Sequence, residues 1–195
     1  MFEIKNLLNR RTVKNFSAKK IPSEILANAT RIAYRTPTSL NSRPVILVDI
    51  SSKKNESWIA HQAAVKTAPH LFLLAVNPKI GEQNARKFLS GRFGTTLDDI
   101  KVSQIISKIM VNRESWACQQ IYLTAGYFSA ILEASGISGC WIAGFEKEIA
   151  TKNLNLPAGY SPELIFACGY KDVENPENFE TEFARSFEEF YFPEN

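Results

Sequence analysis

The stretch from Glu114 to Ser135 constrains the fold more than any other part of this sequence. Its apolar residues recur at helical spacing, and Gly136 follows as a residue typical of a helix end. They cover a wide arc of the helix rather than a narrow stripe, and they are Ile121, Leu123, Ala125, Phe128, Ile131 and Leu132. Such a helix must be buried, either in its own core or against a second subunit.

Short runs of β-branched and aliphatic residues predict strands around this helix. The runs Val45–Ile50 and Leu71–Val76 alternate little, which is the pattern of strands covered on both faces. Two further strands are expected within Ile137–Phe145 and Glu163–Gly169. Helical patterns occupy residues 2–9, a segment opening at Pro22, Trp58–Thr67 and a short stretch near Glu146–Leu154. This alternation predicts a single α+β domain over residues 1–195.

Two segments stand apart from this pattern. Residues 82–111 are polar and helix-favouring, and Gly91 and Gly94 interrupt them, so we expect two helices packed as an excursion from the core. Residues 170–195 are rich in aromatic and acidic side chains without clear periodicity. An aromatic tail needs a surface to cover, and we expect it to wrap its own or a partner subunit.

Composition excludes several classes of protein. Hydrophobic residues make up 45% and charged residues 22% of the 195, which is typical of a globular domain. The formal charge of +3 is too small to indicate a protein of nucleic acids or membrane surfaces. Three cysteines without a CxxC suggest neither a disulfide framework nor a thiolate metal site. Without a signal peptide or a membrane-length apolar run, we expect a cytoplasmic location.

A basic cluster follows the first helical pattern. Arg10, Arg11, Thr12 and Lys14 place three cations and a hydroxyl within five residues, a donor set that matches a phosphate dianion. Such clusters are also common on protein surfaces, and charge pattern alone favours a solvated turn.

Two further segments have the composition of a ligand site. Thr36–Asn41 puts three hydroxyls and an amide into a proline-containing loop before a strand, which suits a polar ligand edge and an ordinary connection equally well. Gly139–Phe145 combines small residues with aromatics and would let the backbone approach a flat ligand, although a core strand with a tight exit explains it better when taken singly. The two histidines, His61 and His70, do not have metal-ligand spacing, and we expect His70 to be a hydrogen-bonded structural residue.

Taken together, these segments identify a family. RRTVKNF, TPTSLNSRP and ESWACQQIYLTAGYFSAILEASGISGCWIAGF, with a late Arg185-Ser186, closely resemble the FMN-dependent nitroreductase family in order and spacing. The branch of oxygen-insensitive NAD(P)H nitroreductases and dihydropteridine reductases is the most similar part of it. The resemblance covers about residues 3–187. It implies a central, mostly antiparallel sheet surrounded by helices, in an intertwined homodimer.

The resemblance also implies how FMN is bound. Arg10, Arg11, Thr12 and Lys14 would hold the phosphate and ribityl, with Arg185 as the remaining member of a C-terminal basic pair whose second position is Phe187. Pro37, Thr38, Ser39 and Asn41 would reach the flavin of the other subunit. Trp141, Ile142, Ala143 and Gly144 would line the flavin ring, and His61 would bond its pyrimidine edge.

Further departures from the family pattern fall in three segments. Arg43-Pro44-Val45 replaces the usual Gln-Pro-Trp, Ala143 replaces an acidic residue, and Ala64 stands where a Lys or Gln is expected. Lys66 compensates for Ala64 only if the register of that helix differs.

The resemblance implies a ping-pong reaction. Hydride would pass from NADH or NADPH through FMN to a nitroaromatic, a quinone or a similar electron-poor acceptor, with Phe88 and Phe93 on the rim of the substrate channel. No protein general base, metal, nucleic acid or membrane enters this prediction. Two alternatives remain: an FMN protein of this fold that acts as a dehalogenase, pteridine reductase or flavin-linked sensor, and an interaction protein without a cofactor.

Overall fold

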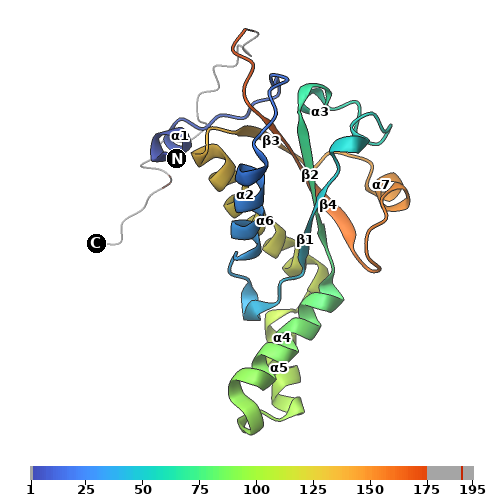
Figure 1. Ribbon diagram of the computed structural model, residues 1–195. Coiled ribbons are helices and arrows are strands. Elements are labelled where there is room, and N and C mark those ends of the chain that lie inside the picture. Colours follow the sequence, from blue (N-terminus) through green and yellow to red (C-terminus); the bar gives the residue numbers. More distant parts are fainter. Residues whose placement is uncertain (1, 175–189, 191–195) are drawn as a thin grey trace.

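Four antiparallel strands form the centre of the computed structural model, which describes residues 2–174 and 190 (Figure 1). The strands are β1 (Val45–Asp49), β2 (His70–Val76), β3 (Ser138–Ile142) and β4 (Ser161–Gly169), and their spatial order is β1-β2-β4-β3. His70 pairs with Cys168, which pairs in turn with Gly139, so this register fixes one end of the sheet. The mostly antiparallel sheet predicted from the sequence is confirmed.

The long helix α6 (Arg113–Ala134) covers one face of the sheet, beside α2 (Ser23–Tyr34). The Asn112 side chain caps its start by accepting from the Ser115 N–H at 2.9 Å. Phe128 is fully buried and meets Phe72 and Phe166 edge-on, at ring-centroid distances of 5.2 and 5.9 Å. The helix predicted over 114–135 is therefore confirmed, and its buried side faces its own sheet.

The other side of α6 stays open. Tyr122, Leu123 and Tyr127 are 65%, 48% and 44% exposed in the single chain. The short helix α1 (Ile4–Leu8), which packs at the far end of α6, also leaves Ile4 and Leu8 exposed. Within residues 2–174, none of the helices has the length and apolar character needed to cross a membrane.

The opposite face of the sheet is covered by the short helices α3 (Ala63–Thr67) and α7 (Lys147–Asn153). Trp58 is fully buried there, with its ring 6.0 Å from that of Phe145. The helix predicted over Trp58–Thr67 forms only from Ala63 onward. The preceding residues make turns, and the Trp58 carbonyl accepts from the Glu146 N–H at 3.3 Å, which ties this segment to the start of α7.

Helices α4 (Pro78–Phe93) and α5 (Asp99–Ile109) extend beyond the sheet as the predicted excursion (Figure 1). The Asn77 side chain caps α4 by accepting from the Ile80 N–H at 3.1 Å, and Gly94, with φ +53°, ends it. Glu82 pairs with both Arg86 and Arg113, which ties α4 to the start of α6. Short 3-10 turns occur at η1 (Ser39–Asn41), η2 (Ser51–Lys53) and η3 (Gly94–Thr96), and η3 joins α4 to α5.

One strand differs from its prediction. β1 was expected to be covered on both faces, but it has a single neighbour, β2, and its first four residues are only half-buried. Its apolar run therefore lies at an edge of the sheet that remains accessible within the described part of the chain.

Candidate functional site

The basic cluster Arg10–Lys14 lies in an extended, exposed segment between α1 and the sheet. Two contacts fix its backbone. The Val13 N–H donates to the Gly139 carbonyl at 3.2 Å, and the Thr67 hydroxyl donates to the Lys14 carbonyl at 3.3 Å while accepting from the Phe16 N–H at 3.1 Å. The segment is thus held between β3 and α3, and its cationic side chains are displayed to solvent. Thr67, which the sequence did not single out, belongs to this support.

A small cavity of about 120 Å³ adjoins the cluster. Arg11 and Lys171 line it from two ends of the chain, and Glu133 of α6 lines it as well. Glu133 is 6% exposed. Burial raises its pKa to about 7, although Arg10, the Gly139 N–H and Lys171 each favour the ionised carboxylate.

The exit of β3 lies on the same side of the molecule and offers mainly backbone. Trp141 packs its ring on Phe166 at 4.4 Å, and Ile142 is buried in the core. Ala143 and Gly144 are exposed, so backbone groups there are accessible to a flat ligand.

The predicted residue His61 is linked to the exit of β3 by the next residue, Gln62. Gln62 donates to the Gly144 carbonyl, and its amide nitrogen lies 3.0 Å from His61 Nε2. The sequence did not single out Gln62. In α3, Ala64 faces the core and Lys66 is exposed, so Lys66 is the residue of this helix that offers a cation to solvent.

The loop containing Pro37, Thr38, Ser39 and Asn41 is held in an unusual conformation. Leu40, Asn41 and Arg43 have φ values of +53°, +50° and +42°, a region that non-glycine residues seldom adopt. The Ser39 N–H donates to Gln120 Oε1 at 3.0 Å, and Arg43 Nε donates to Asn41 Oδ1 at 2.9 Å. Local strain that the surroundings maintain in this way is common at ligand sites.

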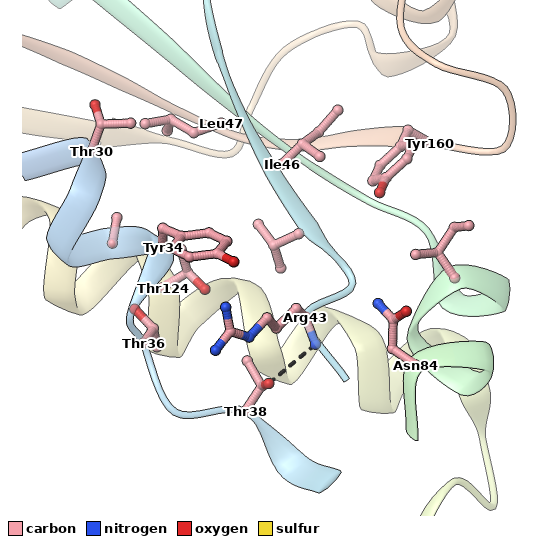
Figure 2. Close-up of a pocket in the computed structure, with 13 residues that line it drawn as sticks. Thr30, Tyr34, Thr36, Thr38, Arg43, Ile46, Leu47, Asn84, Thr124 and Tyr160 are labelled. Carbon is pink, nitrogen blue, oxygen red and sulfur yellow. Dashed lines mark hydrogen bonds between the residues drawn. The ribbon is translucent and has the colours of Figure 1, made fainter. Parts of the chain in front are cut away.

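This loop borders a cavity of about 420 Å³, shown in Figure 2. The Arg43 N–H donates to the Thr38 hydroxyl at 3.1 Å, and the Arg43 guanidinium lies 4.7 Å from the centre of the Tyr34 ring. Thr36 is 3% exposed, and its hydroxyl lacks a hydrogen-bond partner among the described residues. The cavity is therefore lined by polar groups from α2, α4, α6 and the residues that flank η1, with β1 as its apolar side.

The two groups of predicted residues lie at different levels along α6. The Glu3 N–H, which precedes α1 and the basic cluster, donates to the Ala134 carbonyl at the end of α6, whereas Ser39 bonds Gln120, about two turns after the start of that helix. Fourteen residues separate these anchors, which is roughly 21 Å at about 1.5 Å per residue. One chain therefore does not bring the loop at 37–41 to its own basic cluster.

Phe88 and Phe93, the residues predicted for the rim of the substrate channel, lie at the same end of the molecule as the loop at 37–41. Asn84 of α4 donates to the Ser42 carbonyl at 2.9 Å and joins the excursion to it. Phe88 is half-buried against a cluster of buried residues from α4, α5, α6 and the sheet, while Phe93 is exposed at the end of α4. Arg185 lies outside the described residues. Among residues 2–174 no cluster of metal-binding side chains occurs.

Comparison with known proteins gives a consistent result. The sequence model of the nitroreductase family matches residues 7–170. A protein of Thermus thermophilus named NADH dehydrogenase is 26% identical over 177 residues, which cover 86% of this chain and 85% of the relative. An iodotyrosine deiodinase of Thermotoga neapolitana is 21% identical over 168 residues, covering 86% of this chain and 87% of the relative.

The fold is likewise found among solved structures. A protein of Exiguobacterium sibiricum, assigned as a nitroreductase and crystallised in complex with FMN, superposes with a TM-score of 0.69 at 16% identity. The superposition covers 93% of this chain and 94% of that chain.

Proposed function

This chain belongs to the nitroreductase family, and from that premise we propose that it is an FMN-dependent oxidoreductase that uses NADH or NADPH as hydride donor. The relative named NADH dehydrogenase supports the choice of donor, and the similar structure crystallised with FMN supports the choice of cofactor. The proposed acceptors are nitroaromatics, quinones or other electron-poor molecules.

The observation that carries this proposal is the fixed cationic segment. Arg10, Arg11 and Lys14 are exposed on a backbone that β3 and α3 hold in place. Guanidinium groups and an ammonium beside the hydroxyl of Thr12 form a donor set that fits the phosphate dianion of FMN. Arg185 is proposed to complete this set from the C-terminal segment.

The flavin ring is proposed to lie over the exit of β3. Ala143 and Gly144 offer backbone groups there, and His61 and Gln62 offer side-chain donors for the pyrimidine edge. Lys66, exposed on the neighbouring helix α3, is a further candidate. FMN, held by these residues, would supply the hydride-transfer chemistry, and the task of the protein would be to position the ring and exclude water.

A second copy of the chain is proposed to complete each site. The loop carrying Pro37, Thr38, Ser39 and Asn41 lies roughly 21 Å along α6 from its own cationic segment, a separation that a partner subunit would remove. The exposed aromatics of α6 offer the apolar surface for such a homodimer. The tail at 170–195 is proposed to wrap a subunit, and the accessible edge strand β1 provides a surface for it.

The rim of the substrate channel is proposed to come from the excursion of the partner. Because α4 is bonded to the loop through Asn84, it would arrive at the partner's site together with that loop. Phe93 is exposed and offers its ring to an aromatic acceptor. Phe88, on the same helix, packs against the buried residues of α4, α5 and α6. A shared position for nicotinamide and acceptor predicts ping-pong kinetics.

The visible spectrum of the purified chain tests the cofactor. We expect flavin absorbance, and we expect the double variant Arg10→Ala, Arg11→Ala to lose it. The control variant Lys54→Ala, Lys152→Ala removes two exposed cations outside the proposed site and should keep the flavin. Wild-type protein that stays colourless after incubation with FMN would refute the proposal and favour an interaction protein.

A second candidate function is reductive dehalogenation, which the deiodinase relative favours. Oxidation of NADH or NADPH in the presence of nitrofurazone or menadione supports the first function. Bound flavin that gives no turnover with these acceptors, together with iodide release from iodotyrosine, would support the second.

A further inference from the structure

Glu133 is the one charged side chain between Ser115 and Ser135, in a helix that is otherwise apolar or neutral over this stretch. It is 6% exposed and lines the small cavity beside the basic cluster, opposite Arg11 and Lys171. A buried carboxyl in such a helix needs a reason, because burying a charge is costly unless it is paired.

The groups that face this carboxyl come from every element around it. Arg10 and Arg11 approach from the segment after α1, and Lys171 approaches from the segment after β4. From β3, the Gly139 N–H bonds the carboxyl, and Ser138 lines the cavity. The Cys168 thiol lies nearby on β4, where burial raises its pKa and keeps it neutral.

The balance of these contacts leaves both forms of Glu133 populated near neutrality. Burial raises the pKa of the carboxyl to about 7, because the three cationic or dipolar neighbours offset only part of the desolvation. A carboxylate here neutralises part of the cationic cluster, whereas a protonated carboxyl leaves its full positive charge available.

We propose that Glu133 is the internal counter-ion of the phosphate-binding cluster: its carboxylate opposes the phosphate of FMN, and its protonation admits that phosphate. The proposal rests on the proposed function, since it takes Arg10 and Arg11 as the phosphate ligands. Flavin affinity should therefore fall as the pH rises through neutrality, and phosphate binding should draw a proton onto Glu133.

The dissociation constant of FMN tests this, measured by flavin fluorescence at pH 6 and pH 8.5 with wild type and Glu133→Gln. Gln keeps the shape of the protonated carboxyl and cannot ionise, and comparing the two proteins at each pH cancels the titration of the phosphate itself. We expect similar constants at pH 6. At pH 8.5 we expect the wild type to bind about tenfold more weakly, the size of one carboxylate repelling a dianion at the protein surface.

Two controls separate this effect from a general change in the protein. Riboflavin lacks the phosphate, so its affinity should be the same in both proteins at either pH. Glu148→Gln removes an exposed carboxyl of α7 and should follow the wild type for FMN.

Calorimetry in buffers of different ionisation enthalpy gives a second measurement that needs no variant. At pH 7.5 the free phosphate of FMN is already largely dianionic. Net proton uptake on binding to wild type, absent in Glu133→Gln, supports the proposal.

The proposal would be overturned if the ratio of the wild-type to the variant dissociation constant for FMN were the same at both pH values. Weaker FMN binding by Glu133→Gln at both pH values would also overturn it. If neither protein binds FMN at any pH, the proposed function fails as well.

Discussion

Replacing Glu133 by Gln should stabilise the flavin-free protein above neutral pH and leave it nearly unchanged at or below pH 4.5. The buried carboxyl holds its proton more tightly in the folded chain, where its pKa is about 7, than in the unfolded chain, where the ordinary value is 4.5. The folded state is therefore favoured at low pH, and this contribution is lost as the pH rises from 4.5 through about 7.

The size of this change in the free energy of unfolding follows from the pKa shift of Glu133. Each pKa unit corresponds to about 1.4 kcal/mol, so the full difference amounts to about 3 kcal/mol between pH 4 and pH 8. Because Gln cannot ionise, Glu133→Gln does not lose this stability as the pH rises. Its free energy of unfolding should exceed that of the wild type by up to about 3 kcal/mol at pH 8, and the two should agree within about 0.5 kcal/mol at pH 4.5.

Urea unfolding followed by tryptophan fluorescence measures this difference between pH 4.5 and 8.5, without flavin and at one protein concentration. Glu148→Gln serves as the matched control, since an exposed substitution should stay within about 0.5 kcal/mol of wild type throughout. If Glu133→Gln is the less stable protein at pH 8, the attraction of Arg10 and Lys171 outweighs desolvation, and the reasoning about this carboxyl is wrong.

Four further results are expected. Gly139→Ala should destabilise the fold by about 1–3 kcal/mol in urea, because the new Cβ would lie 2.1 Å from the Phe166 ring, whereas Gly91→Ala, which meets nothing within 4 Å, should stabilise it by up to about 1 kcal/mol. Asn77→Ala should lower the free energy of unfolding by about 1–2 kcal/mol, since the side chain caps α4 and also donates to the Ala158 carbonyl at 3.2 Å; Asn77→Ser should restore part of it. Tyr122→Lys with Tyr127→Lys should shift the protein toward monomer in sedimentation, and an unchanged dimer would remove α6 from the proposed interface. Burial raises the pKa of the Cys118 thiol, so Ellman's reagent should react with it slowly at pH 7 and faster toward pH 9, while buried Cys140 and Cys168 should react only in denaturant.

The regular core of the fold was predictable because the spacing of its apolar residues and the residues that end its elements indicated the same structure. Phe128 and its neighbours repeat at helical spacing before Gly136, and α6 formed as expected. The strand pattern of β1 was misleading about burial, since an apolar run does not reveal whether it lies at the centre or the edge of a sheet. His70 was expected to be hydrogen bonded, yet both ring nitrogens are buried without a partner among the described residues, and the ring stacks on Phe72.

The candidate site was only partly predictable. Glu133 carried a usable signal, as a lone charge in an apolar helix, whereas Gln62 and Thr67 carried none. Their roles depend on long-range contacts, to the Gly144 carbonyl and to the Lys14 carbonyl, that no local pattern encodes. The strained φ values of Leu40 and Arg43 were also hidden, because neither residue type favours that conformation.

Two separate positions of α6 anchor the chain just before α1 and the 37–41 loop, through Ala134 and Gln120, so the geometry of the two segments is coupled. A rigid helix transmits rotation as well as distance, and deleting one residue from its middle would turn one end by about 100° relative to the other. Such a deletion would misalign both attachments together, while changes in α5, which packs on α4 beyond the sheet, leave their geometry intact. Diversification of this protein should therefore concentrate in α5 and avoid insertions or deletions between Gln120 and Ala134.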